Sequence, residues 1–239
     1  MSRDDSSPYA IRMPPDIRSV RLGEHQAVFI DNFLENPQAL VEAACAAEFV
    51  PCPGSDERKG YPGVRARMPA EYSAELTALM EPLIRLNFGV PEDLPLRKSE
   101  CNFSLTTTPA AELGPLQHTP HFDASTPHHM AVLLYLCGEE HGGTAFYRHQ
   151  ATGLQQITPD NSERFLDVYY AELNACPPAQ RYFDAADEHF ELLGAMPARF
   201  NRLVIYRGSL LHTAVINPAL SINSDPRSGR LTANSFYDF

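Results

Sequence analysis

The sequence predicts an α+β fold in which helices from the N-terminal part support a C-terminal core of β-strands. In the N-terminal part, apolar residues such as Leu76, Met80 and Leu83 recur at helical spacing. From Asn102 onward, short runs rich in β-branched and aromatic residues replace this pattern. The chain has 239 residues, which is enough to bury one sizeable core, and no repeat or strong linker divides it. We therefore expect a single domain over residues 1–239.

The first hundred residues are expected to hold a tail followed by a helical support. Residues 1–20 are polar and contain prolines, which is typical of a partly ordered tail. The support spans residues 21–100. Within it, the apolar run Ala27–Ile30 predicts a short strand, whereas residues 51–64 are rich in proline and glycine and predict an irregular loop.

Two helices are expected in this support. Asn36 and Pro37 are residue types favoured at the N-cap and first position of a helix, so they predict a helix that runs through Ala47. The second helix is expected over residues 70–87. Pro82 lies inside it and should kink it, because proline cannot donate the backbone hydrogen bond of a helix interior.

Residues 101–239 are expected to form the β core. A segment at about 155–188 is rich in Ala, Glu, Asp and aromatic residues at helical spacing, so we expect a helical insertion there. The expected strands lie at residues 103–107, 130–136, 144–147, 202–206 and 230–236.

Composition excludes several classes of partner. The formal net charge of −11 repels phosphate at long range, so no nucleic acid and no anionic membrane is expected as a partner. The five cysteines are scattered without a CxxC pair, which is typical of reduced thiols. The N-terminus lacks the apolar run of a secretory signal, and the longest apolar stretch, Met130–Cys137, is too short for a membrane span. We expect a soluble, cytoplasmic protein; its oligomeric state is left open.

His121-Phe122-Asp123 is the first motif that could carry chemistry. On an extended strand, residues i and i+2 point to the same side, so one imidazole and one carboxylate would converge. Those are two of the three ligands that a divalent metal ion needs. Taken alone the motif is weak, because a surface histidine near an unrelated aspartate gives the same pattern.

His212 is the third candidate ligand. It follows an apolar strand and a glycine-containing turn, although a buried histidine beside Leu210 and Leu211 is an equally simple interpretation. It is remote in sequence from His121 and Asp123, so only a closed β fold would bring the three together. Two imidazoles and one carboxylate cover one face of an octahedral ion and leave the other open, as in non-haem Fe(II) oxygenases.

Arg230 is a candidate anchor for an anionic cosubstrate, because a guanidinium binds a carboxylate bidentately. Thr232 shares its strand face and could hydrogen-bond the same carboxylate. The alternatives are that Arg230 is a surface charge, or that Arg227 is the anchor; Pro226 and Gly229 place Arg227 in a turn.

Other histidines compete for these roles. His118, His128 and His129 surround the first motif and could line a pocket mouth or replace a ligand, although loop histidines are the more common interpretation. His189 and Glu191 form a second His-x-carboxylate pair. This pair could chelate on a strand but not on a helix, where i and i+2 point apart.

Four motifs in order resemble the prolyl-4-hydroxylase-like branch of the Fe(II)/2-oxoglutarate oxygenase superfamily. More narrowly, His-Phe-Asp, Gly-Gly-Thr-Ala-Phe-Tyr-Arg-His and Gly-Arg-Leu-Thr-Ala-Asn resemble an uncharacterised bacterial family within it. The similarity covers about residues 100–239. The motifs are His121-Phe-Asp123, Gly142-Gly-Thr-Ala-Phe146, the Leu-Val-Ile-Tyr strand before His212, and Arg230-x-Thr232.

The resemblance implies a double-stranded β-helix, or jelly roll, that holds Fe(II) through His121, Asp123 and His212. It also implies 2-oxoglutarate bound at its far end by Arg230 and Thr232, with dioxygen as the oxidant. Tyr135, on the expected strand after the first motif, is a further candidate for the cosubstrate site; the alternative is a tyrosine of the core or of the pocket rim. Arg230 lies farther beyond His212 than the corresponding residue in related hydroxylases, so residues 217–229 are expected to form an inserted loop.

The leading hypothesis is therefore a dioxygenase that hydroxylates a C–H bond of a peptidyl or small-molecule substrate. Asp123 favours hydroxylation over halogenation, because related halogenases carry a small residue there. A second hypothesis is a non-catalytic metal-binding or interaction module on the same fold. A third, a metal-dependent hydrolase or cupin-type isomerase, leaves Arg230 and Thr232 without a role.

Overall fold

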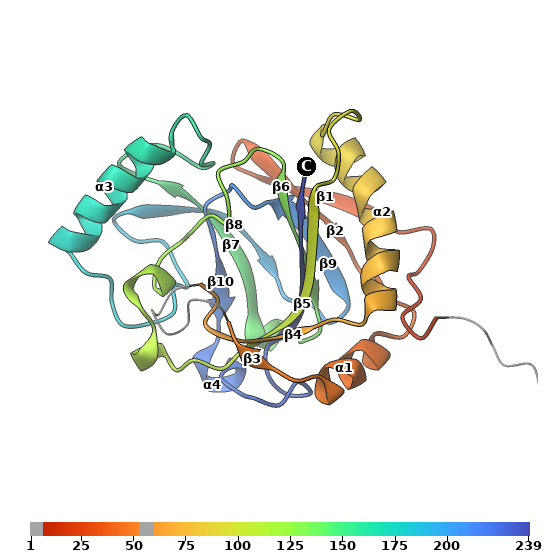
Figure 1. Cartoon of the computed structure of the whole chain (residues 1–239). Helices are drawn as coiled ribbons and strands as arrows, with labels where there is room; N and C mark the ends of the chain where they lie inside the picture. The colour runs from red at the N-terminus through yellow and green to blue at the C-terminus, as the bar shows by residue number, and fades with distance from the viewer. Residues whose placement is uncertain (1–6, 53–59) are drawn as a thin grey trace, which may run out of the picture.

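The computed structural model describes residues 7–52 and 60–239, and its strands form two antiparallel sheets (Figure 1). The eight-stranded sheet has the order β1-β2-β9-β6-β11-β5-β4-β3, and the three-stranded sheet has the order β10-β7-β8. The strands are β1 Ile17–Leu22, β2 His25–Ile30, β3 Val50–Pro51, β4 Gly63–Arg67, β5 Lys98–Thr106, β6 His129–Tyr135, β7 Gly142–His149, β8 Phe190–Pro197, β9 Arg202–Arg207, β10 His212–Ile216 and β11 Leu231–Asp238.

Few helices accompany these sheets. The α-helices are α1 Pro37–Ala46, α2 Ala70–Phe88, α3 Ser162–Ala175 and α4 Pro218–Ser221, and the short 3-10 helices are η2 Ala110–Glu112, η3 Pro115–Gln117 and η4 Glu139–His141. No helix in the described part of the chain combines the length and the apolarity needed to span a bilayer.

The two N-terminal helices follow their predicted bounds closely. α1 starts at Pro37 after Asn36, although the Asn36 side chain makes no capping hydrogen bond. α2 continues through Pro82 and ends at Gly89, whose positive φ of 63° suits a left-handed helix end. Leu86 belongs to the same helical pattern as the buried residues but is 84% exposed, because the buried stripe of α2 ends on Ile84 and Phe88 instead.

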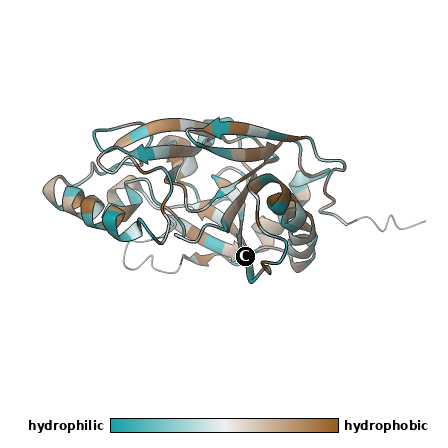
Figure 2. Cartoon of the chain, turned by 90° about the horizontal axis from the view of Figure 1, so that it is seen from above, coloured by the Kyte–Doolittle hydropathy of each residue, from teal (hydrophilic) through white to brown (hydrophobic). Residues whose placement is uncertain are grey.

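Three apolar layers hold the fold together. α1 and α2 pack on one face of the eight-stranded sheet, a second cluster fills the space between the two sheets, and α3 covers the three-stranded sheet. In Figure 1 the sheets accordingly lie between α2 and α3. Seen from above in Figure 2, the long strands alternate between hydrophobic and hydrophilic residues. This alternation places different chemistry on the two faces of each sheet.

The predicted strands are present, but the segments between them were partly misassigned. β1 begins inside the expected N-terminal tail, and β4 begins inside the expected 51–64 loop; part of that loop, residues 53–59, lies outside the described residues. Both strands pair with neighbours far along the chain or across a turn, which local composition does not reveal. The expected helical support therefore also contributes strands to the large sheet.

The predicted helical insertion is only half helical. α3 covers Ser162–Ala175, and residues 176–188 are irregular because Pro177 and Pro178 follow the helix directly. β8 then follows and was not predicted, since its sequence FELLGAMP has no clear alternation. The expected loop at residues 217–229 contains the one-turn helix α4 followed by turns.

Candidate metal and cosubstrate site

Backbone pairing brings the remote histidines together. The amide of His121 donates to the carbonyl of His212 and the amide of His212 donates back, each over 2.8 Å. Two residues on, the amide of Asp123 donates to the carbonyl of Gly208 over 2.7 Å. A Cβ at Gly208 would lie 2.9 Å from the Asp123 carboxylate, so a glycine is needed where this carboxylate approaches the backbone. The segment 121–123 thus lies beside the start of β10 as an isolated antiparallel bridge.

The three candidate ligands converge. One ligand atom from each of His121, Asp123 and His212 lies within 4.8 Å of the others, and no other such group of three occurs in the described part of the chain. The carboxylate of Asp123 is 3.8 Å from Nε2 of His121 and 3.6 Å from Nε2 of His212. Nδ1 of His212 is 2.8 Å from the carbonyl of Leu210. If Nδ1 carries the proton, the lone pair of Nε2 faces the carboxylate.

Burial of the site favours neutral side chains in the absence of a cation. Desolvation lowers the pKa of His212 to about 4, and desolvation with the neighbouring His212 lowers the pKa of His121 to about 4. The His121 side chain is 50% exposed, so solvent weakens its desolvation, whereas the His212 side chain is only 5% exposed. Desolvation also raises the pKa of Asp123. A divalent cation would reverse these penalties, because it binds neutral imidazole and ionised carboxylate. The donor set therefore fits a metal ion.

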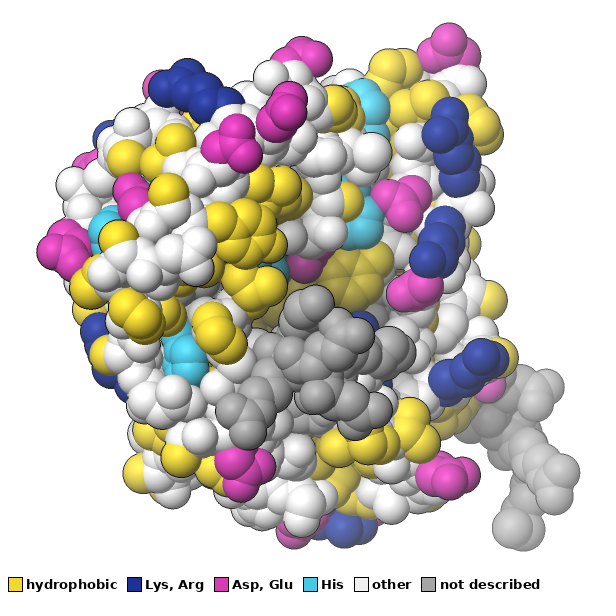
Figure 3. Space-filling model, turned by 60° about the vertical axis from the view of Figure 1, so that its left-hand side comes forward, with side chains coloured by type: hydrophobic (Ala, Val, Ile, Leu, Met, Phe, Trp, Pro, Cys, Tyr) yellow, Lys and Arg dark blue, Asp and Glu magenta, His cyan; other side chains and the backbone are white. Residues whose placement is uncertain are grey.

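The metal-ligand group opens into a pocket of about 380 Å³. Figure 3 shows a hollow whose walls carry histidine, acidic and hydrophobic side chains. A pocket of this volume is in the range of small-molecule sites. Besides the three candidate ligands, its lining includes Tyr61, Arg65, Phe122, Thr144, Tyr182, Tyr206, Arg230, Asn234 and Phe236.

Arg230 reaches this pocket from just before β11. It is 1% exposed, and its Nη2 donates to the carbonyl of Gly143 over 2.9 Å. Its Nε has no partner among the described residues. A buried guanidinium with an unused donor, and with no carboxylate paired to it in the described part of the chain, fits an anionic ligand.

Thr232 and Asn234 follow Arg230 on the inner face of β11. Oγ1 of Thr232 and Oδ1 of Asn234 are buried and have no partner among the described residues. Tyr135 lies opposite Thr232 on β6, but its hydroxyl is 2.6 Å from Oγ1 of Thr144. Thr144 lines the pocket, whereas Tyr135 does not. The centre of the Tyr135 ring lies 6.0 Å from the Arg230 guanidinium.

Arg227, the alternative anchor, lies away from the pocket. Its side chain is 54% exposed, and its Nη2 pairs with the carboxylate of Glu42 over 2.6 Å. This ion pair attaches the 217–229 loop to α1. Arg230, the other candidate, is the arginine of the two that lines the pocket.

The histidines around the first motif lie outside the metal-ligand group, and two of them have other contacts. Nδ1 of His118 is 2.9 Å from the carbonyl of Arg181, so this side chain contacts the loop after α3. His129 is 2.6 Å from the carboxylate of Asp238 and stacks on Phe236. His128 is partly buried, and its pKa is lowered by desolvation. None of the three belongs to the metal-ligand group.

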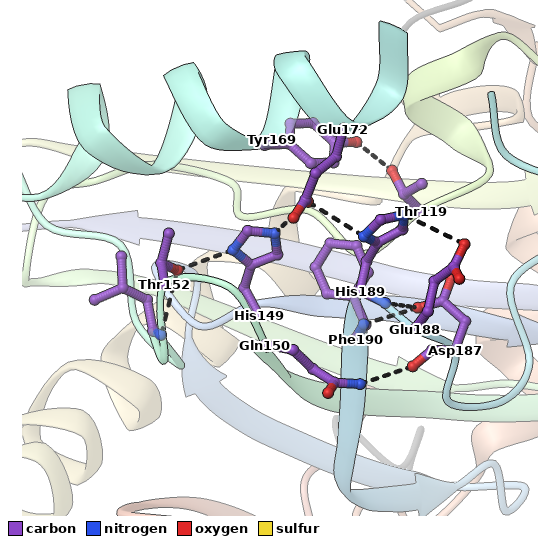
Figure 4. A network of polar contacts seen from close by, with 11 residues as sticks. Thr119, His149, Gln150, Thr152, Tyr169, Glu172, Asp187, Glu188, His189 and Phe190 are labelled. Carbon is purple, nitrogen blue, oxygen red and sulfur yellow. Dashed lines mark hydrogen bonds and ion pairs between the residues drawn. The ribbon is translucent and has the colours of Figure 1, made fainter. Parts of the chain in front are cut away.

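The competing pair His189 and Glu191 does not chelate. Figure 4 shows His189 beside Glu172 of α3 and Glu188, and its nitrogens are 3.5 Å and 3.7 Å from those carboxylates. Glu191 instead pairs with Arg148 over 2.8 Å. His149 is the closest histidine to Glu172, at 2.7 Å, so this cluster ties α3 to the three-stranded sheet.

Several pocket residues were missed by the sequence analysis. Tyr61 lies within the proline- and glycine-rich segment 51–64 and Arg65 follows it; this segment carries no motif, so nothing in the sequence marks the two residues. Tyr206 had a usable signal: it alternates with Val204 on a predicted strand, and both lie in the cluster between the two sheets. Alternation on the strand shows that the two share a face, but it does not show which face lines the pocket.

Comparisons with known proteins give a family and distant structural neighbours. HygX from Streptomyces hygroscopicus, solved with nickel, 2-oxoglutarate and hygromycin B bound, is 11% identical with a TM-score of 0.44, over 88% of this chain and 81% of that one. An N-substituted L-amino acid dioxygenase from Burkholderia ambifaria AMMD is 9% identical with a TM-score of 0.38, over 88% and 80%. These similarities are too low to carry an argument about function.

No curated protein matches the chain. A family model does match, over residues 13–237, and it is described as a family of unknown function, DUF6445. The match spans nearly all of the sequence, including both N-terminal helices and every candidate ligand. The chain therefore belongs to the DUF6445 family.

Proposed function

We propose that this protein is an Fe(II)- and 2-oxoglutarate-dependent dioxygenase that hydroxylates a C–H bond of its substrate. The observation that carries the proposal is the convergence of His121, Asp123 and His212 within 4.8 Å, in a pocket that also contains Arg230. Two imidazoles and one carboxylate form the facial ligand set of non-haem iron oxygenases, which leaves coordination positions open. The two sheets, with the ligands between them, are interpreted as the double-stranded β-helix of this superfamily.

Each residue has a role in the proposal. His121, Asp123 and His212 hold Fe(II), and the carbonyl of Leu210 orients the His212 ring. Arg230 binds the distal carboxylate of 2-oxoglutarate, and Thr232 donates its hydroxyl to the same group. Tyr135 keeps Thr144 in place through their 2.6 Å contact. The open side of the ligand group faces the pocket, where a bound substrate would displace water from the reacting groups.

Iron held by these three residues would supply the oxidative chemistry, in which one oxygen atom of dioxygen would enter the substrate and the other would enter succinate as 2-oxoglutarate loses carbon dioxide. The protein positions the substrate. Aromatic side chains of Phe122, Tyr182 and Phe236 line the pocket and would hold an apolar part of the substrate against the open side of the ligand group.

Thermal-shift titration with Mn(II) and the inert analogue N-oxalylglycine tests binding. Both should raise the melting temperature of the wild type, and the effect of N-oxalylglycine should require Mn(II). Arg227→Met is the matched control for Arg230→Met, because Arg227 lies outside the pocket. Loss of the N-oxalylglycine response in both variants, or in neither, would contradict the assigned anchor.

Turnover separates an enzyme from a non-catalytic module on the same fold. With Fe(II), ascorbate and 2-oxoglutarate, the wild type should release succinate slowly without substrate, whereas a module should release none. Binding of Mn(II) and N-oxalylglycine without any succinate release from 2-oxoglutarate would replace the enzyme proposal with the module.

A further inference from the structure

Arg65 is a second arginine on the wall of the same pocket. It lies on β4 opposite Ser104 of β5, and Ser104 lies opposite Thr232 of β11. Side chains in one cross-strand row point to the same face of a sheet. Arg65 therefore projects from the face that carries Thr232, two strands away, which is about 10 Å at the usual strand spacing.

Aromatic rings hold the Arg65 guanidinium in place. Its central carbon lies 5.5 Å from the centre of the Tyr61 ring and 6.0 Å from that of Phe236, both within the range of cation–π contacts. Such contacts use the faces of the guanidinium and leave its N–H edge free for hydrogen bonds. Nε of Arg65 is buried and has no partner among the described residues.

Three acidic side chains of the described residues line a pocket together with Arg65, and each has another partner or role. Glu100 pairs with Lys98 over 2.5 Å, and Asp238 pairs with His129 over 2.6 Å. The third nearby carboxylate, Asp123, is a metal ligand in the proposed function. In a chain of net charge −11, a cation on a pocket wall without an acidic partner among the described residues is unusual, and it indicates an anionic ligand.

We infer that Arg65 binds the carboxylate of the primary substrate, which is a small carboxylic acid with an apolar body. This inference rests on the proposed function, in which Arg230 already binds 2-oxoglutarate. The apolar body would lie against the rings of Tyr61, Phe122 and Phe236, which line the same pocket. The pocket volume of about 380 Å³ must hold both ligands, so it favours a small molecule over a polypeptide. A single guanidinium flanked by rings suits a carboxylate better than a phosphate, which usually recruits several donors.

A paramagnetic probe tests the inference directly. The protein is loaded with Mn(II) and N-oxalylglycine, and then titrated with a panel of 3-phenylpropionate, hexanoate and N-acetyl-leucine, each beside its neutral amide. Mn(II) accelerates the proton relaxation of any probe bound near it. At least one acid of the panel should show this enhancement, and its amide should bind at least about tenfold more weakly, the cost of losing a hydrogen-bonded charge.

Variants assign the effect to Arg65. Arg65→Met should weaken binding of the acid at least about tenfold without changing the affinity for N-oxalylglycine, and Arg65→Lys should give an intermediate loss. Arg67→Met is the matched control, because Arg67 is an exposed arginine on the same strand and does not line the pocket.

Three results would overturn the inference. One is that no acid of the panel binds better than its amide. Another is equal binding of the acid by the wild type and Arg65→Met. The third is a larger loss of N-oxalylglycine affinity in Arg65→Met than in Arg230→Met, which would make Arg65 the cosubstrate anchor. Failure of Mn(II) and N-oxalylglycine to bind the wild type at all would instead reject the proposed function, and the inference with it.

Discussion

The two faces of the eight-stranded sheet are made by alternate residues of the same strands, yet they differ in chemistry. The face toward α1 and α2 carries apolar side chains that are buried in one continuous core. On β5 and β11, the face toward the three-stranded sheet carries polar side chains with buried atoms that have no partner among the described residues, whereas on β6 and β9 the same face is largely apolar. On β5 and β11 the first face has Phe103, Leu105, Leu231 and Ala233, and the second has Ser104, Thr232 and Asn234.

This difference separates stability from function. Burial of apolar area on the helix face stabilises the fold. A buried polar atom without a partner destabilises the unliganded protein, typically by about 1–3 kcal/mol. A protein retains such an atom where it is needed for function, for example where a bound ligand supplies the missing partner. Substitutions on the helix face should therefore lower the free energy of unfolding and leave ligand binding unchanged. Substitutions on the pocket side should weaken ligand binding and leave the free energy of unfolding unchanged or higher.

The largest effect is expected from His212→Ala. His212 lies on β10 of the three-stranded sheet, across the pocket from the eight-stranded sheet. Loss of one of three metal ligands should lower Mn(II) affinity and succinate release at least about 100-fold, more than the loss of an outer-shell partner costs. His25→Ala, at a half-buried histidine that begins β2, is the control and should keep both properties. Succinate release and metal content measure the effect. Normal succinate release from His212→Ala would refute the ligand assignment.

Leu231→Ala tests the helix face. Leu231 is 0% exposed and packs in the core with α1 and α2, so truncation should lower the free energy of unfolding by about 2–5 kcal/mol. Denaturant unfolding measures this loss. The affinity of the folded protein for N-oxalylglycine should stay within about twofold of the wild type. A large loss of affinity at matched folded fraction would mean that the two faces are not independent.

Arg230→Met tests the pocket face at Arg230, whose buried charge should destabilise the unliganded protein. Removal of the guanidinium should weaken N-oxalylglycine about 10- to 100-fold, the value of a hydrogen bond to a charged group. The unliganded variant should be as stable as the wild type or more stable, because an apolar side chain of similar volume replaces a buried charge without a carboxylate partner. Isothermal titration and denaturant unfolding measure the two quantities. A variant that loses several kcal/mol of stability would show that Arg230 is structural.

The stability of the metal-free protein should depend on pH through His212, on the other wall of the pocket. The native pKa of His212 is about 4, below the value of about 6.5 in an unfolded chain. Between these values the unfolded state binds more protons, so stability is complete above pH 6.5 and falls as the pH drops toward 4. At pH 5 this one histidine should cost up to about 2 kcal/mol.

His212→Gln isolates that contribution, because glutamine does not titrate. Denaturant unfolding of metal-free protein at pH 7 and pH 5 should show a smaller loss for His212→Gln than for the wild type. Equal losses in both proteins would mean that burial of His212 does not lower its pKa.

Much of the fold could be predicted from the sequence where the pattern is local. The helices at 37–46 and 70–88 carry an apolar stripe and terminal residues of the right type, and the strand at 129–135 is one apolar run. β4 and β8 were missed because their residues do not alternate clearly; they are strands because β5 and β7 provide partners. Pairing across such distances is a tertiary effect that local propensity does not contain.

The residues of the candidate site also divide into those that the sequence predicts and those that only tertiary packing reveals. His121, Asp123, His212 and Arg230 stand in recognisable motifs and could be named from the sequence. Arg65 could not, since only the row from β4 through β5 to β11 places it opposite the motif residues. Tyr135 was named for a role in binding the cosubstrate, but its hydroxyl contacts Thr144. Which group a side chain contacts depends on packing between the sheets.

Thr232→Val gives the smallest effect and the most direct comparison of the two faces. Valine has the shape of threonine, and Oγ1 of Thr232 has no partner among the described residues, so stability should be unchanged or slightly higher. N-oxalylglycine should bind about two- to tenfold more weakly, since a neutral hydrogen bond contributes about 0.5–1.5 kcal/mol. Ser235→Ala is the matched control, because Ser235 is a buried hydroxyl on the opposite face of β11. If both variants weaken N-oxalylglycine equally, the effect is transmitted through the strand and the hydroxyl of Thr232 does not contact the ligand.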